Sequence, residues 1–286
     1  MKIAIQGEPG SFSEEAALNL LPQAKIDCCP SFREVFAHLA DRVVDRALIP
    51  IENTLAGSVT ENYDLLREHK AFILAETQLR IEHHLIIHPE SSRRQIRRVL
   101  SHPVALQQCR AFLRKHPQWE VVPFYDTAGS VKQMMANGWK DAAAVASRRA
   151  ASVYSARILE EGIEDNKKNY TRFFLLGRTE KWSSQGDKVS LAFTIRNQPG
   201  ALFKCLSVFA LRDLNLTRIE SRPVPGRPWE YCFYVDFLGN PQQPATRNAL
   251  RHLEEITDSV KVLGVYPSAQ SAESRHESRK VGKSLA

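Results

Sequence analysis

The chain has 286 residues, of which 43% are hydrophobic and 25% charged, and its formal net charge is +7. This composition is ordinary for a soluble globular protein, and the length is sufficient for two domains with separate cores. No apolar run approaches the roughly 20 residues that span a bilayer, so we expect no membrane segment. A strand pattern starts at Met1 and leaves no room for a signal peptide, so we expect a cytoplasmic protein.

The cysteines and histidines do not form a recognisable metal or disulfide pattern. Five cysteines, an odd number, contain no CxxC pair, which fits a reducing compartment and argues against a structural zinc. Cys28 and Cys29 fit strand positions better than a vicinal redox pair. His83 and His84 lack acids or thiols at ligand spacing, so we interpret them as polar positions near a strand.

The positive charge is concentrated in two segments. Residues 93–98 contain four arginines and fit a solvated helix face, and residues 268–286 have the composition of a disordered tail. Neither segment is interleaved with stacking aromatic residues or matches a nucleic-acid motif. The charge therefore fits anionic small molecules at least as well as nucleic acid as partners.

Up to about residue 180, short apolar runs alternate with helical patterns, which is typical of an α/β fold. Strands are predicted at Lys2–Gln6, Lys25–Cys29, Arg46–Ile51, Phe72–Ile87, Val99–Ser101, Glu120–Phe124, Ala142–Ala146 and Arg172–Leu176. Ser11 with Glu14, and Ser31 with Glu34, read as reciprocal capping boxes. A helix is predicted to begin at Pro103 and run to about Lys115. The long stretch Phe72–Ile87 would cross between two lobes.

A second domain is predicted after the Gly186-Asp187 boundary. Its order is strand, helix, strand, strand, helix, strand, at Lys188–Ile195, Ala201–Leu211, Leu216–Ser221, Trp229–Phe237, Thr246–Thr257 and Val260–Val265. This βαββαβ order is the ferredoxin-like arrangement. Small sheets of this kind often bury an edge against a second copy, so we expect a homo-oligomer, a dimer or tetramer.

Four strand–helix junctions of the first domain carry small and polar residues. They are Gly7–Ser13, Pro50–Val59, Ser101–Pro103 with the following Gln107 and Gln108, and Tyr125–Ser130. Ordinary helix capping explains each junction by itself. In open α/β sheets, however, ligands bind in the crevice outside the strand ends, and these junctions would meet there.

Residues 169–176, Asn-Tyr-Thr-Arg-Phe-Phe-Leu-Leu, place a polar trio at the entrance of a strongly apolar run. Asn169, Thr171 and Arg172 would thus be held at the rim of a hydrophobic element. Taken alone, the segment fits a strand entrance satisfied by backbone groups. Together with the four junctions, it predicts one edge of a cleft between two lobes.

Seven segments resemble prephenate dehydratases that carry a C-terminal ACT regulatory domain: Gly7–Ser13, Ile51–Ser58, Ser101–Cys109, Ala144–Ala151, Asn169–Phe173, Gly200–Phe203 and Glu220–Pro223. The resemblance extends over residues 1 to 267, and Asn62–Leu66, Asp126–Gly129 and Phe209–Leu216 resemble the plant-type arogenate dehydratases. It implies a two-lobed, periplasmic-binding-protein-like catalytic domain (1–180), an ACT domain (188–267) and a tail (268–286). The implied reaction is decarboxylating dehydration of prephenate to phenylpyruvate, with no metal or organic cofactor.

The resemblance also assigns site residues. Thr171 would donate to the departing oxygen, with Arg172 and Phe173 completing its motif. Substrate-binding roles fall to Ser11, Glu52, Asn53, Thr54, Ser101, Gln108 and Thr127. Thr54 replaces a common serine and Val104 a common glutamine. Tyr125, next to Asp126, stands where some relatives have glutamate, so a role for Asp126 stays open.

The ACT resemblance implies an effector site for phenylalanine. Its predicted residues are Asn197, Gly200, Ala201, Leu202, Phe203, Glu220, Ser221 and Arg222. We expect Gly200 to permit close backbone approach, and the Glu220–Arg222 segment to hold the ammonium and carboxylate groups. The alternative is that these residues form only turn and dimer contacts.

Three other functions remain open from the sequence. Arogenate differs from prephenate by an amino group in place of the side-chain keto group, and the same residues would suit it. Two lobes around a cleft also fit a non-catalytic solute-binding or sensor protein, which would not need the Thr171 hydroxyl. A nucleic-acid role rests only on the net charge.

Overall fold

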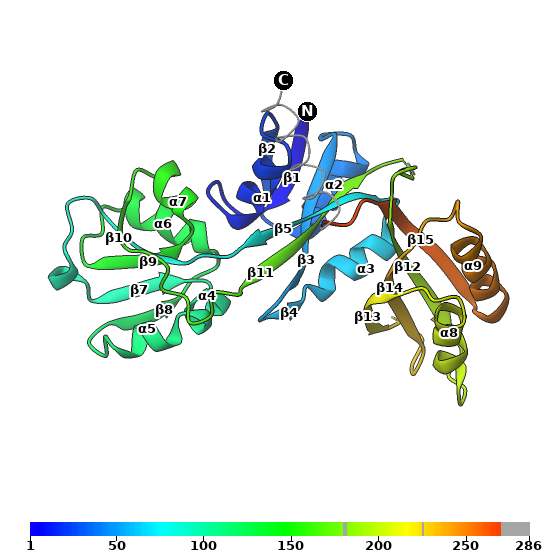
Figure 1. The fold of residues 1–286 in the computed structure, drawn as a ribbon. Helices are drawn as coiled ribbons and strands as arrows, with labels where there is room; N and C mark the ends of the chain where they lie inside the picture. Colours follow the sequence, from blue (N-terminus) through cyan, green and yellow to red (C-terminus); the bar gives the residue numbers. More distant parts are fainter. Residues whose placement is uncertain (180–181, 225, 270–286) are drawn as a thin grey trace, which may run out of the picture. The chain divides into compact units, whose positions relative to one another are not determined.

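The computed structural model describes residues 1–179, 182–224 and 226–269 (Figure 1). The chain divides into two compact units. The first comprises residues 1–62 and 77–173, and the second begins with residues 63–76 and continues from residue 174. These bounds differ from a simple division near residue 180, because most of one helix and part of one strand from the first half belong to the second unit. Among the described residues, no helix is long and apolar enough to cross a membrane.

The first sheet has the strand order β2-β1-β3-β11-β5, with the short β4 paired to β3. Its strands are β1 (Lys2–Gln6), β2 (Lys25–Cys29), β3 (Arg46–Asn53), β4 (Gly57–Ser58), β5 (Phe72–Arg80) and β11 (Tyr170–Gly177). Strands β1, β2 and β3 are parallel, and α1 (Phe12–Leu20) and α2 (Phe32–Ala40) connect them. Parallel strands joined by helices bury both faces, which explains why Ile3, Ile5 and Ile49 are fully buried.

The second sheet has the order β10-β6-β9-β7-β8. Its strands are β6 (His84–Ile87), β7 (Arg98–Ser101), β8 (Glu120–Pro123), β9 (Ala142–Ala146) and β10 (Arg157–Glu160). Helices α4 (Pro103–Gln108), α5 (Arg110–Arg114), α6 (Thr127–Ala136) and α7 (Arg148–Val153) accompany it, with a 3-10 turn at Arg93–Gln95. Leu85 and Val145 belong to one core cluster and Ile86 and Ala144 to another, because alternate side chains face opposite sides. The predicted two-lobed α/β architecture is confirmed.

Two predicted elements of this half were too long. The stretch Phe72–Ile87 is β5 and β6, which lie in different sheets, so the predicted crossing between lobes is right but the single strand is wrong. The helix predicted from Pro103 to Lys115 breaks at Cys109 into α4 and α5. Strand β10 is not predicted by the sequence, because Arg157–Glu160 has little apolar periodicity.

The second unit contains a four-stranded antiparallel sheet of order β13-β14-β12-β15. Its elements are β12 (Lys188–Ile195), α8 (Ala201–Ala210), β13 (Leu216–Pro223), β14 (Tyr231–Leu238), α9 (Pro244–Ile256) and β15 (Ser259–Tyr266). Both helices cover one face of this sheet (Figure 1), where Phe193, Phe209 and Phe237 form the core. The predicted βαββαβ arrangement is confirmed.

The first two residues of the predicted disordered tail, Ser268 and Ala269, are ordered. The Ser268 amide donates to Asp187 at 2.6 Å and the Ala269 amide donates to Glu76 at 2.8 Å, so these two residues are held by the second unit. The rest of the predicted tail, 270–286, lies outside the described residues.

Candidate active site

A cavity of about 280 Å³ lies in the first unit, between the strand ends of the two sheets. Its wall comprises Phe12, Ser13, Pro50, Asn53, Ala56, Val59, Ile81, His83, His102, Val104, Ala105, Gln108, Thr127, Thr171 and Phe173. All four predicted junctions contribute residues to this wall, and Gly7–Ser13 contributes Phe12 and Ser13. Convergence of the junctions at one crevice is what the strand-end rule predicted.

Contacts between the loop after β1 and the second sheet's helices hold the two lobes together. Glu8 accepts hydrogen bonds from the Tyr125 hydroxyl and the Lys132 ammonium, both at 2.9 Å. The Ser147 hydroxyl donates to the Gly10 carbonyl at 2.7 Å. Gly10 has φ +87°, and a Cβ there would lie 2.7 Å from the Ala150 Cα. Only glycine permits this backbone approach, so the glycine of this junction is required by packing.

The orientation of the Asn53 amide is fixed by the backbone. Its Oδ1 accepts the N–H groups of Leu55 and Ala56 at 3.0 and 2.8 Å, and backbone nitrogen can only donate. Its Nδ2 must therefore face the other way. There it donates to the Asn169 Oδ1 at 2.8 Å and to the Thr171 Oγ1 at 3.0 Å. The turn after β3 thus determines the hydrogen-bond polarity at the cavity wall.

The same hydrogen-bond polarity continues along a chain of buried and half-buried side chains. Because the Asn169 Oδ1 accepts from Asn53, its Nδ2 is the atom that donates to the Gln108 Oε1, at 2.9 Å. His83 Nε2 lies 2.9 Å from that oxygen and must also donate to it. His83 is therefore the Nε2–H tautomer. We refer to Asn53, Asn169, Gln108 and His83 as the amide chain.

Thr171 lies at the end of the amide chain, with 9% of its surface exposed, and lines the cavity. Its oxygen already accepts from Asn53, so its hydroxyl hydrogen is available to donate elsewhere. A hydroxyl held by a neighbour that can only donate to it becomes a directed hydrogen-bond donor. The Thr171 hydroxyl can therefore donate a hydrogen bond to a molecule bound in the cavity.

The described cavity wall contains no aspartate, glutamate, lysine or arginine. Burial lowers the pKa of His83, so its imidazole is neutral at physiological pH. Positive potential comes instead from helix N-termini: Phe12 and Ser13 begin α1, and Thr127 begins α6. Such a site suits an anion bound through hydroxyls and amides beside an apolar wall.

Five predicted site residues do not line the cavity. Arg172 follows Thr171 on β11, and alternation turns it to the opposite face of the strand. The Ser101 hydroxyl donates to the Val145 carbonyl and ties β7 to β9. Thr54 donates to the Lys168 carbonyl and accepts the Tyr170 amide. The hydroxyls of Ser101 and Thr54 are thus engaged in structural bonds, and neither residue lines the cavity.

Glu52 and Ser11 are the other two. Glu52 lies on β3 opposite Ser58, outside the wall. Ser11 caps α1 by accepting the Glu14 amide, as predicted. The Glu14 carboxylate does not complete a reciprocal box; it accepts the Gly10 amide at 2.7 Å and pairs with Arg149. The neighbouring Ser13 is the serine that reaches the cavity.

Four residues of the site have no role of their own predicted from the sequence: His83, His102, Ser13 and Asn169. The sequence predicts only an ordinary polar position for His83, because no periodicity distinguishes a histidine that points into a cleft. Asn169 belongs to the predicted polar trio, but its sequence position predicts no role for it. Only its 0% exposure and its two amide bonds reveal it as a positioning group.

Asp126 is the N-cap of α6, where its side chain accepts the Gly129 amide at 2.7 Å. Burial is the largest influence on the carboxyl and raises its pKa. It does not line the cavity, so its position supports a structural role in presenting Thr127.

The predicted effector residues fall into two groups at one end of the second unit's sheet. Ile195 pairs with Tyr231, and Tyr231 pairs with Pro223, so the turn after β12 and the end of β13 are neighbours. Gly200 caps α8 with φ +75°, and a Cβ there would meet nothing within 4 Å. No atom of the described chain requires a glycine there by close packing, and the glycine serves a left-handed conformation. The predicted close approach of an effector to Gly200 stays a prediction. Phe203 is 74% exposed.

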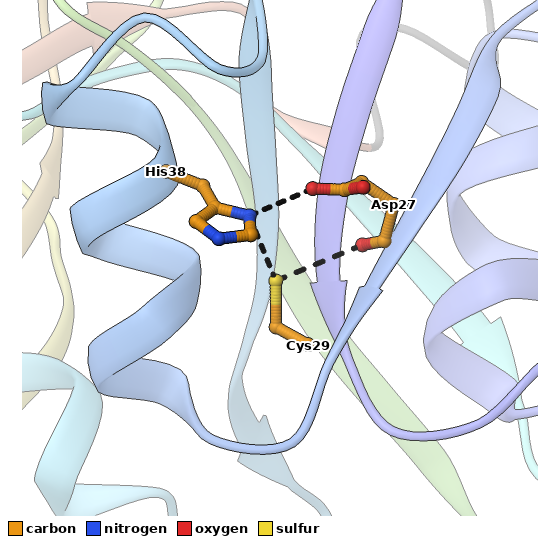
Figure 2. Close-up of side chains that lie close together, drawn as sticks. All are labelled: Asp27, Cys29 and His38. Carbon is orange, nitrogen blue, oxygen red and sulfur yellow. Dashed lines mark hydrogen bonds and ion pairs between the residues drawn. The ribbon is translucent and has the colours of Figure 1, made fainter.

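One group of three metal-ligand side chains occurs among the described residues, away from the cavity (Figure 2). His38 Nδ1 lies 2.7 Å from the Asp27 carboxylate and 3.5 Å from the Cys29 sulfur. Lys2 pairs with the other Asp27 oxygen at 2.9 Å, and burial raises the Cys29 pKa to about 11. The three groups satisfy one another between β2 and α2, and an adjacent cation opposes binding of another.

The fold and the site together define a family. The prephenate dehydratase family matches residues 3–181, and the ACT domain family matches residues 189–255. The chain therefore belongs to the prephenate dehydratase family and carries an ACT domain.

Its relatives include two plant enzymes. The chain is 42% identical over 279 residues to arogenate dehydratase/prephenate dehydratase 2 of Arabidopsis thaliana, covering 93% of this chain and 73% of that protein. It is 40% identical to arogenate dehydratase 1 of Petunia hybrida, covering 93% and 67%.

Solved structures give the same fold. Prephenate dehydratase from Arthrobacter aurescens, in complex with L-Phe, matches with a TM-score of 0.88 at 27% identity, covering 100% of this chain and 99% of that one. GqqA, described as a novel type of quorum quenching acylase, matches with a TM-score of 0.87 at 35% identity, covering 94% and 98%.

Proposed function

We propose that residues 1–180 catalyse the decarboxylating dehydration of prephenate to phenylpyruvate, in the biosynthesis of phenylalanine. The observation that carries the proposal is the Thr171 hydroxyl, whose oxygen is fixed by the Asn53 amide while its hydrogen stays available to the cavity. Family membership supports the reaction class, and the amide chain supplies the physical means. Thr171 is the catalytic residue, and Phe173 forms the apolar wall beside it.

In the reaction, the bond between the ring and its carboxyl carbon breaks and the carboxyl leaves as CO2. The electron pair enters the ring and expels the ring hydroxyl, which takes up a proton and leaves as water. Aromatisation drives the step, so the enzyme need only stabilise negative charge on the departing oxygen. A preorganised donor in a dry site does this effectively, and Thr171 is such a donor.

The two substrate carboxylates require different surroundings. Ser13 and Thr127, at the starts of α1 and α6, suit the side-chain carboxylate, which must be held. The ring carboxylate must lose its charge as CO2, so an apolar wall without cationic side chains favours its departure. Val59, Ile81 and Phe173 form such a wall. The described wall thus discriminates between the carboxylates without a charged residue.

Substitution of Thr171 tests the proposal. Thr171→Ala should lower kcat by at least about 100-fold while KM for prephenate changes little, since the lost bond acts on the transition state. Thr171→Ser should recover part of the rate. Thr194→Ala, which removes a hydroxyl from a strand of the second unit, is the matched control and should leave kcat unchanged. Near wild-type turnover by Thr171→Ala would refute the assignment.

Arogenate is the alternative substrate, and the names of the plant relatives favour it. Its ammonium group would need an anionic or strong acceptor partner, and the described cavity wall offers no carboxylate. We therefore infer a preference for prephenate. Side-by-side measurement of kcat/KM for both substrates tests this, and a higher value for arogenate would reverse the inference.

Acyl hydrolysis is a second candidate, because GqqA shares the fold at 35% identity. Thr171 would then need a general base to become a nucleophile. Asn53 only donates to it, and among the described residues no basic group is hydrogen-bonded to the Thr171 hydroxyl. The described geometry therefore favours the dehydratase, and incubation with an acylated amine should release no free acid.

The substitution Thr171→Val distinguishes the dehydratase from a non-catalytic solute-binding protein. A solute-binding protein would retain its full function in this variant.

We propose that residues 188–267 regulate the enzyme by binding phenylalanine. The turn Asn197–Phe203 and the segment Glu220–Arg222 lie at one end of the sheet, and a relative of the same fold was solved with L-Phe. Titration calorimetry of the intact protein should show saturable L-Phe binding, and substitution of Phe203 or Ser221 should weaken it. No heat of binding would end this proposal.

We also propose a cytoplasmic homo-oligomer, a dimer or tetramer. The five free cysteines suit a reducing compartment, and β13 is an edge strand of the second unit's sheet among the described strands. Light scattering should give a mass that is two or four times 32.4 kDa. A monomer at micromolar concentration would contradict the proposal.

A further inference from the structure

Helix α3 (Thr60–Glu68) connects the catalytic cavity with the second unit along the chain. It starts directly after the loop that contains Asn53, Ala56 and Val59, all part of the cavity wall. Its residues up to Asn62 belong to the first unit, and those from Tyr63 belong to the second. One continuous helix thus has its first turn in the catalytic unit and its remaining turns in the regulatory unit.

The first turn of α3 is fastened to the cavity wall. Asn62 is fully buried, and its Nδ2 donates to the Pro50 carbonyl at 2.7 Å, while its backbone N–H donates to the Val59 carbonyl at 3.1 Å. Pro50 and Val59 both line the cavity. A displacement of this turn must therefore move the wall or break these two hydrogen bonds.

Within the second unit, the middle of α3 is held by the sheet face opposite α8 and α9. The Tyr234 hydroxyl donates to the Tyr63 carbonyl at 2.9 Å, and the two rings lie 4.9 Å apart. The Arg218 guanidinium lies 4.4 Å from the centre of the Tyr63 ring, a cation–π contact. Tyr63 is 2% exposed, so this contact is a packed anchor.

The C-terminal end of α3 is capped by a lysine of the same sheet. Lys261 Nζ donates to the carbonyls of Leu66 and His69 at 2.9 and 3.1 Å. A positive charge at the C-terminus satisfies orphan carbonyls and complements the helix dipole. Helix α3 is thereby attached to β15 as well as to β14 and β13.

The remaining contact involves a residue predicted to bind the effector. The Arg222 guanidinium donates to both Asp64 carboxylate oxygens, at 2.8 and 3.4 Å. The two side chains are 31% and 27% exposed, so this pair is open to exchange, unlike the buried Tyr63 anchor. On β13, Arg218, Glu220 and Arg222 alternate onto the face that holds α3.

We propose that the Arg222–Asp64 pair is the switch through which phenylalanine acts on the cavity, with α3 as the transmitting element; this rests on the proposed function. The effector carboxylate is a bidentate acceptor of the same geometry as Asp64 and competes for the same guanidinium. When it takes Arg222, α3 loses its one exchangeable attachment. The helix then shifts on its Tyr63 anchor, and Asn62 carries the shift to Pro50 and Val59.

The test is Asp64→Asn, which weakens the pair but retains an acceptor and a similar shape. Glu61→Gln is the matched control, since Glu61 is an exposed acid of the same helix outside these contacts. Three quantities are measured on the full chain: the Kd for L-Phe by calorimetry, the change in kcat/KM caused by saturating L-Phe, and hydrogen exchange of residues 50–62 with and without L-Phe.

In the wild type and Glu61→Gln, we expect L-Phe to change kcat/KM by a factor in the range of about 5 to 150, typical of allosteric coupling, and to alter exchange in residues 50–62. In Asp64→Asn, L-Phe should still bind, and more tightly because its competitor is weakened. Its effect on kcat/KM should fall below about twofold, and the exchange response should disappear.

The outcomes separate this inference from the proposed function. If Asp64→Asn retains the full effect of L-Phe, or if L-Phe leaves the exchange of residues 50–62 unchanged in an active, regulated wild type, the switch is wrong. If the wild type neither turns over prephenate nor binds L-Phe, the proposed function itself fails. A weakened L-Phe Kd in Asp64→Asn would contradict competition for Arg222.

Discussion

Two polar regions of this protein differ in their electrostatics: one is formed by neutral hydrogen-bonding groups and the other by charged groups. The cavity wall uses neutral groups: the amide chain of Asn53, Asn169, Gln108 and His83 ends at the Thr171 hydroxyl. The sheet face that holds α3 uses charges, with Arg222 on Asp64, Lys261 on helix carbonyls and Lys188 on Glu76.

The difference corresponds to what each region must do. A neutral chain whose polarity is set by backbone amides has one hydrogen-bond pattern, so it holds a catalytic donor in one orientation. An ion pair that is partly exposed can exchange one carboxylate for another at little cost, which suits effector binding. The Lys188–Glu76 pair differs from the other charged contacts of this face. It is buried, so no solvent is available to replace either partner and the pair does not exchange.

The largest expected effect concerns that buried pair. Lys188 Nζ contacts both Glu76 oxygens at 3.1 Å, with side chains 10% and 2% exposed. Lys188→Met leaves a buried carboxylate without its cation and should lower the free energy of unfolding by about 3–5 kcal/mol. Urea unfolding measures this. Lys188→Met combined with Glu76→Leu should recover most of the loss; equal loss in both variants would show that the pair acts only through packing.

The next effect tests whether polarity, and not shape, matters in the neutral chain. Asn53→Asp keeps the acceptor for Leu55 and Ala56 but replaces the donor to Thr171 by a second acceptor. The Thr171 hydrogen would then turn to the new carboxylate and away from the cavity. We expect kcat to fall about 100- to 1000-fold with the fold intact by circular dichroism. Activity within about threefold of the wild type would show that the chain's polarity is irrelevant.

A smaller effect is expected at the far end of the amide chain. His83→Leu removes the donor to Gln108 and should lower kcat by roughly tenfold through disorder of the chain, with little change in KM. His83→Gln can place an amide N–H near the lost Nε2–H and should restore much of the rate. If both variants lose activity equally, His83 serves only to fill space. Thermal unfolding of both variants controls for stability.

The smallest effect is a pH dependence of stability. Burial lowers the folded-state pKa of His83, so the unfolded chain binds the proton more tightly. Stability from this group is therefore present above the unfolded pKa of about 6.5 and is lost as pH falls below it, by at most about 1.4 kcal/mol per pH unit. The wild type should lose more stability than His83→Gln between pH 6.5 and 5, as measured by urea unfolding. Parallel curves would contradict a buried neutral histidine.

Local patterns predicted most of the fold. Lys2–Gln6, Lys25–Cys29, Ala142–Ala146 and Lys188–Ile195 were placed with their observed bounds, because apolar runs and helix caps are local signals. The errors concern elements whose limits depend on contacts between residues that are distant in sequence. Phe72–Ile87 reads as one apolar run, and only assembly assigns its halves to two sheets.

The site divides in the same way. The sequence by itself determined which junctions meet and that Thr171 stands among them, since strand ends and motif order are properties of the chain. Tertiary structure alone decided the hydrogen-bond partner of each hydroxyl and amide. The Ser101 and Thr54 hydroxyls donate to backbone carbonyls, while Asn169 and His83 donate to Gln108 in the amide chain. The physical reason is that a hydrogen bond depends on the direction and distance of a partner far away in sequence. Asn53 and Thr171 are 118 residues apart, and no local pattern records that contact.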